Sequence, residues 1–231
     1  MKQLNLLAEF DACEPQNAPN DGQDQNGNNG TVANGHEYID LGLSVKWATC
    51  NVGATKPEEE GNFFAWGETA PKTTYKWSTY KYGSDEDELT KYCTNSIYGK
   101  YGKNGFIDNK TVLDPEDDAA TVLWGGKWRM PTDEEWTELR EKCTWTWTTR
   151  NGINGYKGTS KINGNSIFFP VGRWSWIDLD IEFDLGEYWS SSLCTDHSHY
   201  AWDVYLNSKE MDRYYKYRYE GNFIRPVIKI D

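Results

Sequence analysis

From residue 36 onward, glycine and asparagine divide the chain into apolar runs that are too short for long helices or for repeated βαβ units. Several of these runs alternate apolar and polar residues, which is typical of strands with one buried face. The alternation is clearest where Ile39, Leu41, Leu43 and Val45 occupy every second position. We expect short antiparallel strands within residues 38–47, 62–68, 144–149, 166–172, 187–192, 199–207 and 222–230.

Two segments carry helix signals. In residues 131–141, Thr132 can cap the first turn and Glu135 follows three residues later, as in a capping box. Trp136, Leu139 and Cys143 would then mark the buried stripe of this helix. Residues 115–123 begin with proline and acidic residues, which favour the start of a second short helix. Two short helices and many short strands predict an α+β domain and argue against a parallel α/β sheet.

The amino-terminal part differs in composition from the rest. Residues 14–35 are a low-complexity run of Asn, Gly, Gln, Asp and Pro that offers no apolar face to bury. We expect residues 1–35 to be a disordered leader and polar linker, and residues 36–231 to form the folded domain. The leader ends in Cys13 and is similar to a bacterial lipoprotein signal, which would attach the protein to a membrane through a lipid anchor. Because Glu9 and Asp11 interrupt its short apolar run, an altered or simply disordered leader is the alternative.

The charge and aromatic content exclude several classes of protein. With 24 basic and 36 acidic residues, the formal net charge is −12, so nucleic acids and anionic membranes would be repelled. The 12 Trp and 15 Tyr can bury much surface, which argues against a chain that is disordered throughout. Five cysteines without a CxxC pair leave two alternatives open, buried free thiols or a disulfide.

Five long motifs are spread along the folded part of the chain. They are EYIDLGLSVKWA (37–48), FAWGET (64–69), WGGKWRMPTDEEW (124–136), YWSSS (188–192) and IRPV (224–227). Together they resemble the Fibrobacter succinogenes major paralogous domain family, which is common in surface and secreted proteins of gut bacteria. The resemblance implies a C-type-lectin-like fold, related to that of the formylglycine-generating enzymes. In that scaffold we expect buried Trp128, Trp136, Leu139 and Trp189, with Arg129 or Arg225 bonded to backbone or carboxylate groups.

The carboxy-terminal segment resembles a second pattern. Six of the 15 tyrosines and two of the three histidines lie within residues 194–222, interleaved with Asp and Ser. In target proteins of diversity-generating retroelements, adenines of Asn codons such as AAC are rewritten, which yields Tyr, Asp, His or Ser but never Lys, Glu or Trp. The resemblance implies a diversified segment at about 173–222. Departures from the scheme are Lys209, Glu210, Lys216, Glu220 and the tryptophans of a second unusual stretch, 173–183.

The tyrosines of this segment suggest a displayed binding surface, since tyrosine gives a large contact area at a low entropic cost. The alternative is an antiparallel sheet that carries tyrosine on its outer face because of strand propensity. Neighbouring strand residues point to opposite faces, so one buried face does not account for both Tyr214 and Tyr215. We expect the ligand-binding residues to be Asp196, His197, His199, Tyr200, Asp203, Tyr205, Asp212, Tyr214, Tyr215, Lys216, Tyr217, Tyr219 and Glu220.

No catalytic or metal-binding constellation stands out in the sequence. His197 and His199 form an HxH pair, which on a polar loop is more often a surface feature than a metal site. Calcium-dependent sugar binding by C-type lectins uses an EPN or QPD loop followed by WND, and only Trp202-Asp203 matches a part of it. The acidic runs at 58–60, 85–88 and 114–118 are expected to be solvated faces. We therefore expect no enzyme activity, no cofactor and no metal.

These observations predict a monomeric binding protein whose rigid scaffold displays a variable, tyrosine-rich surface. Its expected partner is a protein or glycan on another cell or surface. Its expected location is the cell surface or the secreted fraction, with a phage particle as the alternative. The other candidate function is that of a non-diversified paralogue, acting as a structural or glycan-binding surface module. A neighbouring reverse-transcriptase gene and a near-repeat of the 3′ end that differs only at adenines would favour the first function.

Overall fold

The computed structural model describes residues 31–101, 105–176 and 181–230 of the chain. A five-stranded antiparallel sheet joins the two ends of this range. Within it, the carboxy-terminal strand β12 (Val227–Ile228) lies between β3 (Lys46–Ala48) and β4 (Trp128–Arg129). Beyond β3 lie β2 (His36–Ile39) and the edge strand β1 (Thr31–Ala33). The fold is thus closed by pairing between residues that are far apart in the sequence.

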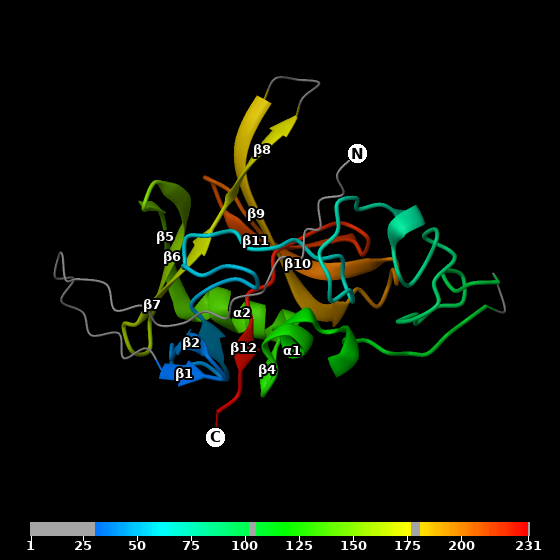
Figure 1. Cartoon of the computed structure of the whole chain (residues 1–231), viewed down its shortest axis with the longest axis horizontal. Coiled ribbons are helices and arrows are strands. Elements are labelled where there is room, and N and C mark those ends of the chain that lie inside the picture. The colour runs from blue at the N-terminus through cyan, green and yellow to red at the C-terminus, as the bar shows by residue number, and fades with distance from the viewer. Residues whose placement is uncertain (1–30, 102–104, 177–180, 231) are drawn as a thin grey trace, which may run out of the picture.

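Two further sheets are also antiparallel. One has the order β11 (Met211–Tyr217), β10 (Tyr200–Leu206), β9 (Ile181–Leu193) and β8 (Gly172–Trp176), and its β8–β9 hairpin projects from the rest of the molecule (Figure 1). The other consists of β5 (Cys143–Arg150), β6 (Ile153–Ser160) and β7 (Ser166–Pro170). Asn151 and Gly152 close the β5–β6 hairpin with positive φ at both residues, the turn geometry that an Asn-Gly pair favours.

The main helix, α2 (Asp133–Lys142), forms as the sequence predicts. The Thr132 side chain accepts a hydrogen bond from the Glu135 backbone N–H, and the Glu135 carboxylate accepts one from the Thr132 N–H. The second expected helix is divided into the 3-10 turn η3 (Pro115–Asp117) and α1 (Ala119–Trp124), because Asp118 is extended and caps α1. Two short helices with antiparallel sheets confirm the α+β class.

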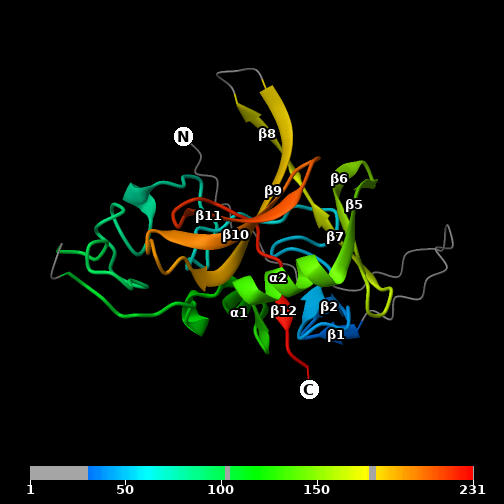
Figure 2. The same ribbon diagram turned by 180° about the vertical axis from the view of Figure 1, so that it is seen from behind.

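A tryptophan-rich core supports α2 and the sheets around it. Trp128, Trp136, Leu139 and Trp189 are each at most 1% exposed, as predicted. The Trp136 indole N–H donates to the Trp189 carbonyl at 3.2 Å, and the Trp189 indole N–H donates to the Phe64 carbonyl at 2.7 Å. In Figure 2, α2 lies between the β10–β11 strands and the sheet that contains β12. Both expected arginine roles are present, since Arg129 pairs with Glu135 and Arg225 donates to Asn51 and to backbone carbonyls.

Several expected boundaries differ from the structure. The run 38–47 forms two strands rather than one, because Gly42 has a φ of +72° and donates to the Asp40 carboxylate in a tight turn. Residues 62–68 contribute only a single bridge, between Phe64 and Asn222, and the run 222–230 narrows to β12. Strands β1, β4, β6 and β11 lie outside the expected runs, and β8 shares only Gly172 with them.

The amino-terminal boundary also shifts. Thr31–Ala33 pair with β2, so the folded part begins before residue 36. Residues 1–30 lie outside the described residues, and with them Cys13 and the leader, so the lipid anchor and the disordered linker stay predictions.

The acidic runs 58–60 and 114–118 are not simply solvated faces, and for these two the expectation is corrected, whereas Asp85, Glu86 and Asp87 of the third run are exposed as expected. Glu58, Asp117 and Asp118 are buried, with exposures of 8%, 1% and 4%. Each carboxylate has hydrogen-bond donors that offset its loss of water. Asp118 accepts from two backbone N–H groups, and Glu58 accepts from Asn151. Asp117 accepts from lysine and tyrosine side chains, described next.

Between β3 and α1, residues 49–101 and 105–118 form what we call the loop region, which contains the 3-10 helices η1 (Trp77–Thr79) and η3. It lies beside β10 in both views (Figures 1 and 2). Two buried charged side chains fasten it. Arg218, which follows β11, donates to the Tyr80 hydroxyl and to the carbonyls of Lys91, Tyr92 and Ser198 at 2.9–3.1 Å. Asp117 accepts from Lys81, Lys91, Tyr82 and Tyr92.

Candidate ligand-binding surface

Strands β10 and β11 bring the tyrosine-rich segment together. In their antiparallel register, Tyr200 lies opposite Tyr217 and Trp202 lies opposite Tyr215. Residues that are directly opposite share a face of the sheet, so these four side chains lie on one side. The backbone ladder alone therefore gathers residues that are up to 17 positions apart, since 217 − 200 = 17.

Strand β11 is the edge of its sheet, and this explains why two consecutive tyrosines are exposed. Tyr214 and Tyr215 are 53% and 40% exposed, and their rings stack with centroids 5.1 Å apart and an interplanar angle of 4°. Side chains that begin on opposite faces of an edge strand can meet around its outer side, where no further strand lies. The two alternatives from the sequence, a displayed surface and a sheet that carries tyrosine on its outer face, are therefore compatible in β11.

Ring contacts extend from this pair into one continuous cluster. The Tyr200 ring centroid lies 4.6 Å from Tyr217, 5.0 Å from Tyr215 and 4.1 Å from His199, and Tyr217 stacks on Tyr219 at 5.4 Å. Aromatic pairs at these separations attract each other and hold the rings in place. We call the cluster the aromatic surface, and its members are Trp77, Tyr98, His197, His199, Tyr200, Trp202, Tyr205, Tyr214, Tyr215, Tyr217 and Tyr219.

Two members of the aromatic surface come from the loop region and were not predicted. Trp77, in η1, contacts Tyr219 with centroids 4.9 Å apart, and Tyr98 contacts His199 at 4.7 Å. No spacing in the sequence links residues 77 and 98 to residues 199 and 219. The one available signal is the density of tyrosine and tryptophan in the loop region itself, at residues 75–101.

The charged residues expected to contact ligand are largely paired within the chain. Lys216 lies 2.7 Å from Glu187 and 2.9 Å from Glu220, and Asp212 pairs with Arg140 of α2. Burial would lower the pKa of Lys216, but the two carboxylates outweigh it and raise the pKa, so the lysine stays charged. Lys216, Glu220 and Asp212 therefore help to fix the strands as well as border the aromatic surface.

Two predicted contact residues are buried, and the expectation that they are displayed is corrected. His199 is 6% exposed, and Asp203 is 1% exposed. His199 is covered by Tyr98 and by Tyr200, while Asp203 faces Asn222, which donates to it at 3.1 Å. Neither side chain can touch a partner without rearrangement. Asp196 and His197, in the turn before β10, are exposed as predicted.

Burial also changes the ionisation of these two residues. Burial, with the nearby charges of His197 and Arg218, lowers the pKa of His199 to about 4, so the ring is neutral at physiological pH. Its Nδ1 has no hydrogen-bond partner among the described residues. Burial raises the pKa of Asp203 well above 3.8, and the nearby Glu187 adds to the rise. These two residues act as supports beneath the surface.

A metal-like grouping occurs away from the aromatic surface, in the loop region. Carboxylate oxygens of Asp114, Glu116 and Asp117 lie within 4.8 Å of one another, as ligands of one ion would. However, the ammonium group of Lys91 lies 2.7 Å, 3.5 Å and 2.6 Å from these three carboxylates. The lysine thus supplies the positive charge at the position where an ion would lie.

Three of the described cysteines lie in the interior, and Cys50 is half-buried. Cys93, Cys143 and Cys194 are buried free thiols. Burial raises the pKa of each, to about 11 for Cys143, so the thiolate form is disfavoured. For these three residues the structure favours the buried-thiol alternative over a disulfide. Cys13 lies outside the described residues.

Among the described residues, the helices are too short and polar to span a membrane. Comparison of the chain with models of known protein families, with curated proteins and with solved structures gave no match.

Proposed function

We propose that this protein is a binding protein, in which a rigid scaffold displays the aromatic surface to a protein or glycan partner. The observation that carries the proposal is the convergence of the late tyrosines, through the β10–β11 register and with Trp77 and Tyr98, into one partly exposed cluster. Tyrosine and tryptophan are the residues that most often anchor binding interfaces, because they combine large area with few rotatable bonds. The scaffold beneath is held by buried Trp189, Arg218 and Phe223.

We further propose that the scaffold is a C-type-lectin-like fold of the Fibrobacter succinogenes major paralogous domain family, and that its surface is the target of a diversity-generating retroelement. The support is the chemistry of the exposed positions. Tyr200, Tyr214, Tyr215 and His197 can all arise from AAC codons. Three departures from that scheme have structural roles, since Lys216 and Glu220 form an ion pair and Glu210 accepts a hydrogen bond from the Tyr205 hydroxyl at 2.6 Å.

The proposed setting follows from the same pattern. A diversified binding protein acts where partners change, so we place it at the cell surface or in the secreted fraction, with a lipid anchor on the leader or a phage particle as its carrier. We propose that it acts as a monomer and without catalysis.

A library experiment tests the binding function. Codons for Tyr200, Tyr205, Tyr214, Tyr215 and Tyr217 are replaced by mixtures that encode AAC-derived residues, and the library is displayed and selected against a panel of purified bacterial surface proteins. The matched control varies the exposed β5 positions Thr144, Thr146 and Thr149 on the same scaffold. We expect folded, specific binders from the first library and few from the second. Equal yields from both, or none from the first, would contradict the proposal.

A genomic comparison separates the two candidate functions. Sequencing this gene across a bacterial or phage population should reveal variation confined to adenine-derived codons within residues 173–222, with a reverse-transcriptase gene nearby. Invariant tyrosine codons would instead favour the non-diversified structural or glycan-binding module.

A further inference from the structure

An acidic rim borders one end of the aromatic surface. The exposed residues Asp85, Glu86 and Asp87 lie in the loop region, directly before a backbone pairing in which Leu89 N–H donates to the Tyr98 carbonyl at 2.9 Å. Tyr98 belongs to the aromatic surface, so this pairing holds the acidic run beside it. Asp196 completes the rim from the turn before β10, which Thr94 ties to the loop region through its hydrogen bond to the Thr195 carbonyl.

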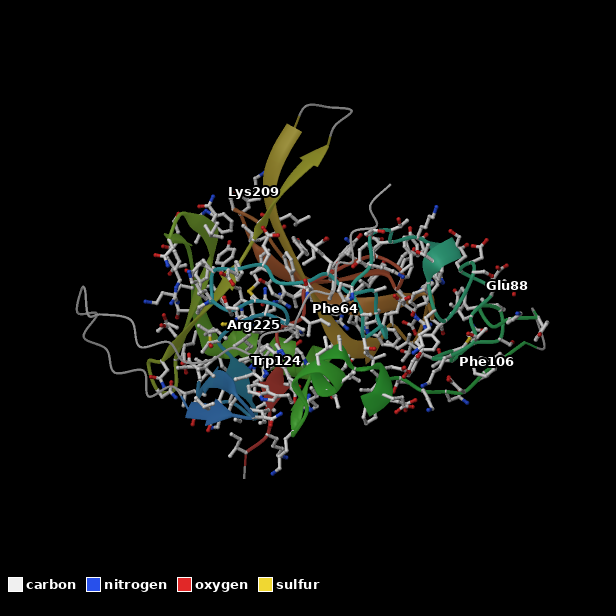
Figure 3. The ribbon with its side chains drawn as sticks, viewed as in Figure 1. Phe64, Glu88, Phe106, Trp124, Lys209 and Arg225 are labelled. Atoms are coloured by element: carbon white, nitrogen blue, oxygen red, sulfur yellow. The ribbon has the colours of Figure 1, made fainter. Side chains whose placement is uncertain are left out.

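Electrostatic coupling supports the same placement of the rim. The pKa of Tyr200 is raised chiefly by its hydrogen bond with Tyr217 and by burial, and the charge of Glu86 adds to the rise. In Figure 3, Lys209 in the β10–β11 turn and Glu88 in the loop region lie on opposite sides of the molecule. The negative rim is thus at the Tyr200–Tyr217 end.

The charges around the aromatic surface are unevenly satisfied. The cations on β11 and directly after it are engaged within the chain, since Arg213 pairs with Asp133, Lys216 pairs with Glu187 and Glu220, and buried Arg218 is bonded to four oxygens. The exposed Lys209 lies in the β10–β11 turn, at the end away from the rim, and the exposed Lys76 precedes Trp77. By contrast, Glu86, Asp87 and Asp196 make no ion pair with any residue that the structure describes. At the rim itself, the charge left for a partner to neutralise is therefore negative, in line with the net charge of −12.

We infer that the partner of the aromatic surface is a protein segment that presents arginine or lysine side chains to Tyr98, Tyr200 and the acidic rim. A cation over a tyrosine face is attracted by the ring, and an adjacent carboxylate completes its coordination. The inference rests on the proposed binding function and narrows its partner class. Complementary charge of this kind also speeds encounter and excludes acidic partners.

The test uses two synthetic probes of equal length, (Arg-Gly)5 and (Glu-Gly)5, titrated into the full chain and into charge variants. The rim variant is Glu86→Gln with Asp87→Asn. The control variant, Glu134→Gln with Glu141→Gln, removes the same charge from exposed positions of α2. At about 0.1 M salt the screening length is about 10 Å, so charges next to the bound peptide affect its affinity, whereas those on α2 are screened.

We expect the arginine peptide to bind at least about tenfold more tightly than the acidic peptide. The rim variant should weaken the arginine peptide about threefold or more, while the control variant changes it less than about twofold. Tyr200→Ser should weaken it as well, through loss of the aromatic face. Matching melting temperatures of the parent and the charge variants would show that both variants are folded.

Three results would overturn the inference: no binding of the arginine peptide at millimolar concentration, equal binding of both peptides, or equal losses in the rim and control variants. Its failure is distinguishable from failure of the proposed function. If surface libraries yield specific binders to acidic partners, the binding function stands and this inference falls. If no surface library yields binders, the proposed binding function falls, and the inference falls with it even where the arginine peptide binds at the rim.

Discussion

The aromatic surface is assembled from two regions that are held by different forces. On the β10–β11 side, a continuous backbone ladder and an apolar core that includes Val204 and Leu206 set the positions of the tyrosines. On the loop-region side, little regular structure is present, and the buried charges of Asp117 and Arg218 hold the chain. A ladder uses backbone atoms and tolerates exchange of its outward side chains, whereas a polar network depends on each member. Substitutions are therefore expected to change stability little in the β10–β11 strands and to lower it markedly in the loop region.

The largest effect is expected from the core that supports the sheet side. Trp136→Ala should destabilise the protein by about 3–5 kcal/mol, because it removes a large buried aromatic that contacts Trp47, Phe169 and Tyr188. Chemical denaturation measures the change, with the exposed Thr146→Ala as the control. A Trp136→Ala protein that melts within a degree or two of the parent would mean that the sheet has another support.

The second prediction breaks the loop region alone. Asp117→Asn should cost about 2–3 kcal/mol, because the lysines and tyrosines around it lose their charged acceptor. Amide exchange should accelerate in residues 80–95 and much less in β10 and β11. Equal acceleration in both regions would show that they unfold as one unit and would contradict this prediction.

Acid should act on the same network. Burial would raise the pKa of Asp117, but hydrogen bonds from Lys91, Tyr82 and Tyr92 outweigh it, and its pKa falls below 3.8. A carboxyl with a lowered folded-state pKa stabilises the protein above its unfolded pKa, and this is lost as the pH falls through the folded value. The parent should thus lose stability below about pH 4, while Asp117→Asn should lack this component.

The third prediction concerns Asp203 on the sheet side, where the pH dependence of stability has the opposite sign to that of Asp117. Because the pKa of Asp203 is raised, the folded state holds its proton more tightly, and stability falls as the pH rises above 3.8. Asp203→Asn removes this cost and should stabilise the protein near neutral pH, as measured by chemical denaturation. The gain should shrink toward acidic pH. Destabilisation at pH 7 would instead show that the carboxylate is satisfied by a group such as Lys216.

The smallest effect on stability is expected at the exposed tyrosines of β11. Tyr214→Asn and Tyr215→Asn should each change the free energy of unfolding by less than about 0.5 kcal/mol, since both side chains are at least 40% exposed. His199→Asn, in the buried layer below, should cost more. If the two tyrosine variants prove as costly as His199→Asn, the stacked pair belongs to the scaffold and is not free to vary.

Local signals in the sequence were sufficient for part of this fold. The capping box of Thr132 and Glu135 and the tryptophan at position 136 are read within one helix, so α2 and its buried face could be predicted. Proline and acidic residues also located the second helix, although the extended Asp118 that divides it was not foreseen.

The candidate site was predictable only where a strand's own pattern sufficed. The tyrosines of residues 200–219 stood out by composition, but the alternation of Trp202, Asp203 and Val204 does not tell which face is covered. The return of the chain at Asn222 covers Asp203, and that contact spans 19 residues. Likewise, Trp77 reaches Tyr219 across a loop region whose path depends on Arg218 and Asp117. Such placements follow from tertiary packing and leave no local periodicity.

The position of Lys91 among three carboxylates has a consequence for the conditions in which the protein can work. A fold that binds a free ion gains stability only in proportion to the logarithm of the ion's concentration, and a chelator removes that gain. A tethered ammonium group is present at a high and constant effective concentration. The loop region thus carries its own counter-ion, and we expect its shape to be the same in calcium-poor and calcium-rich fluids.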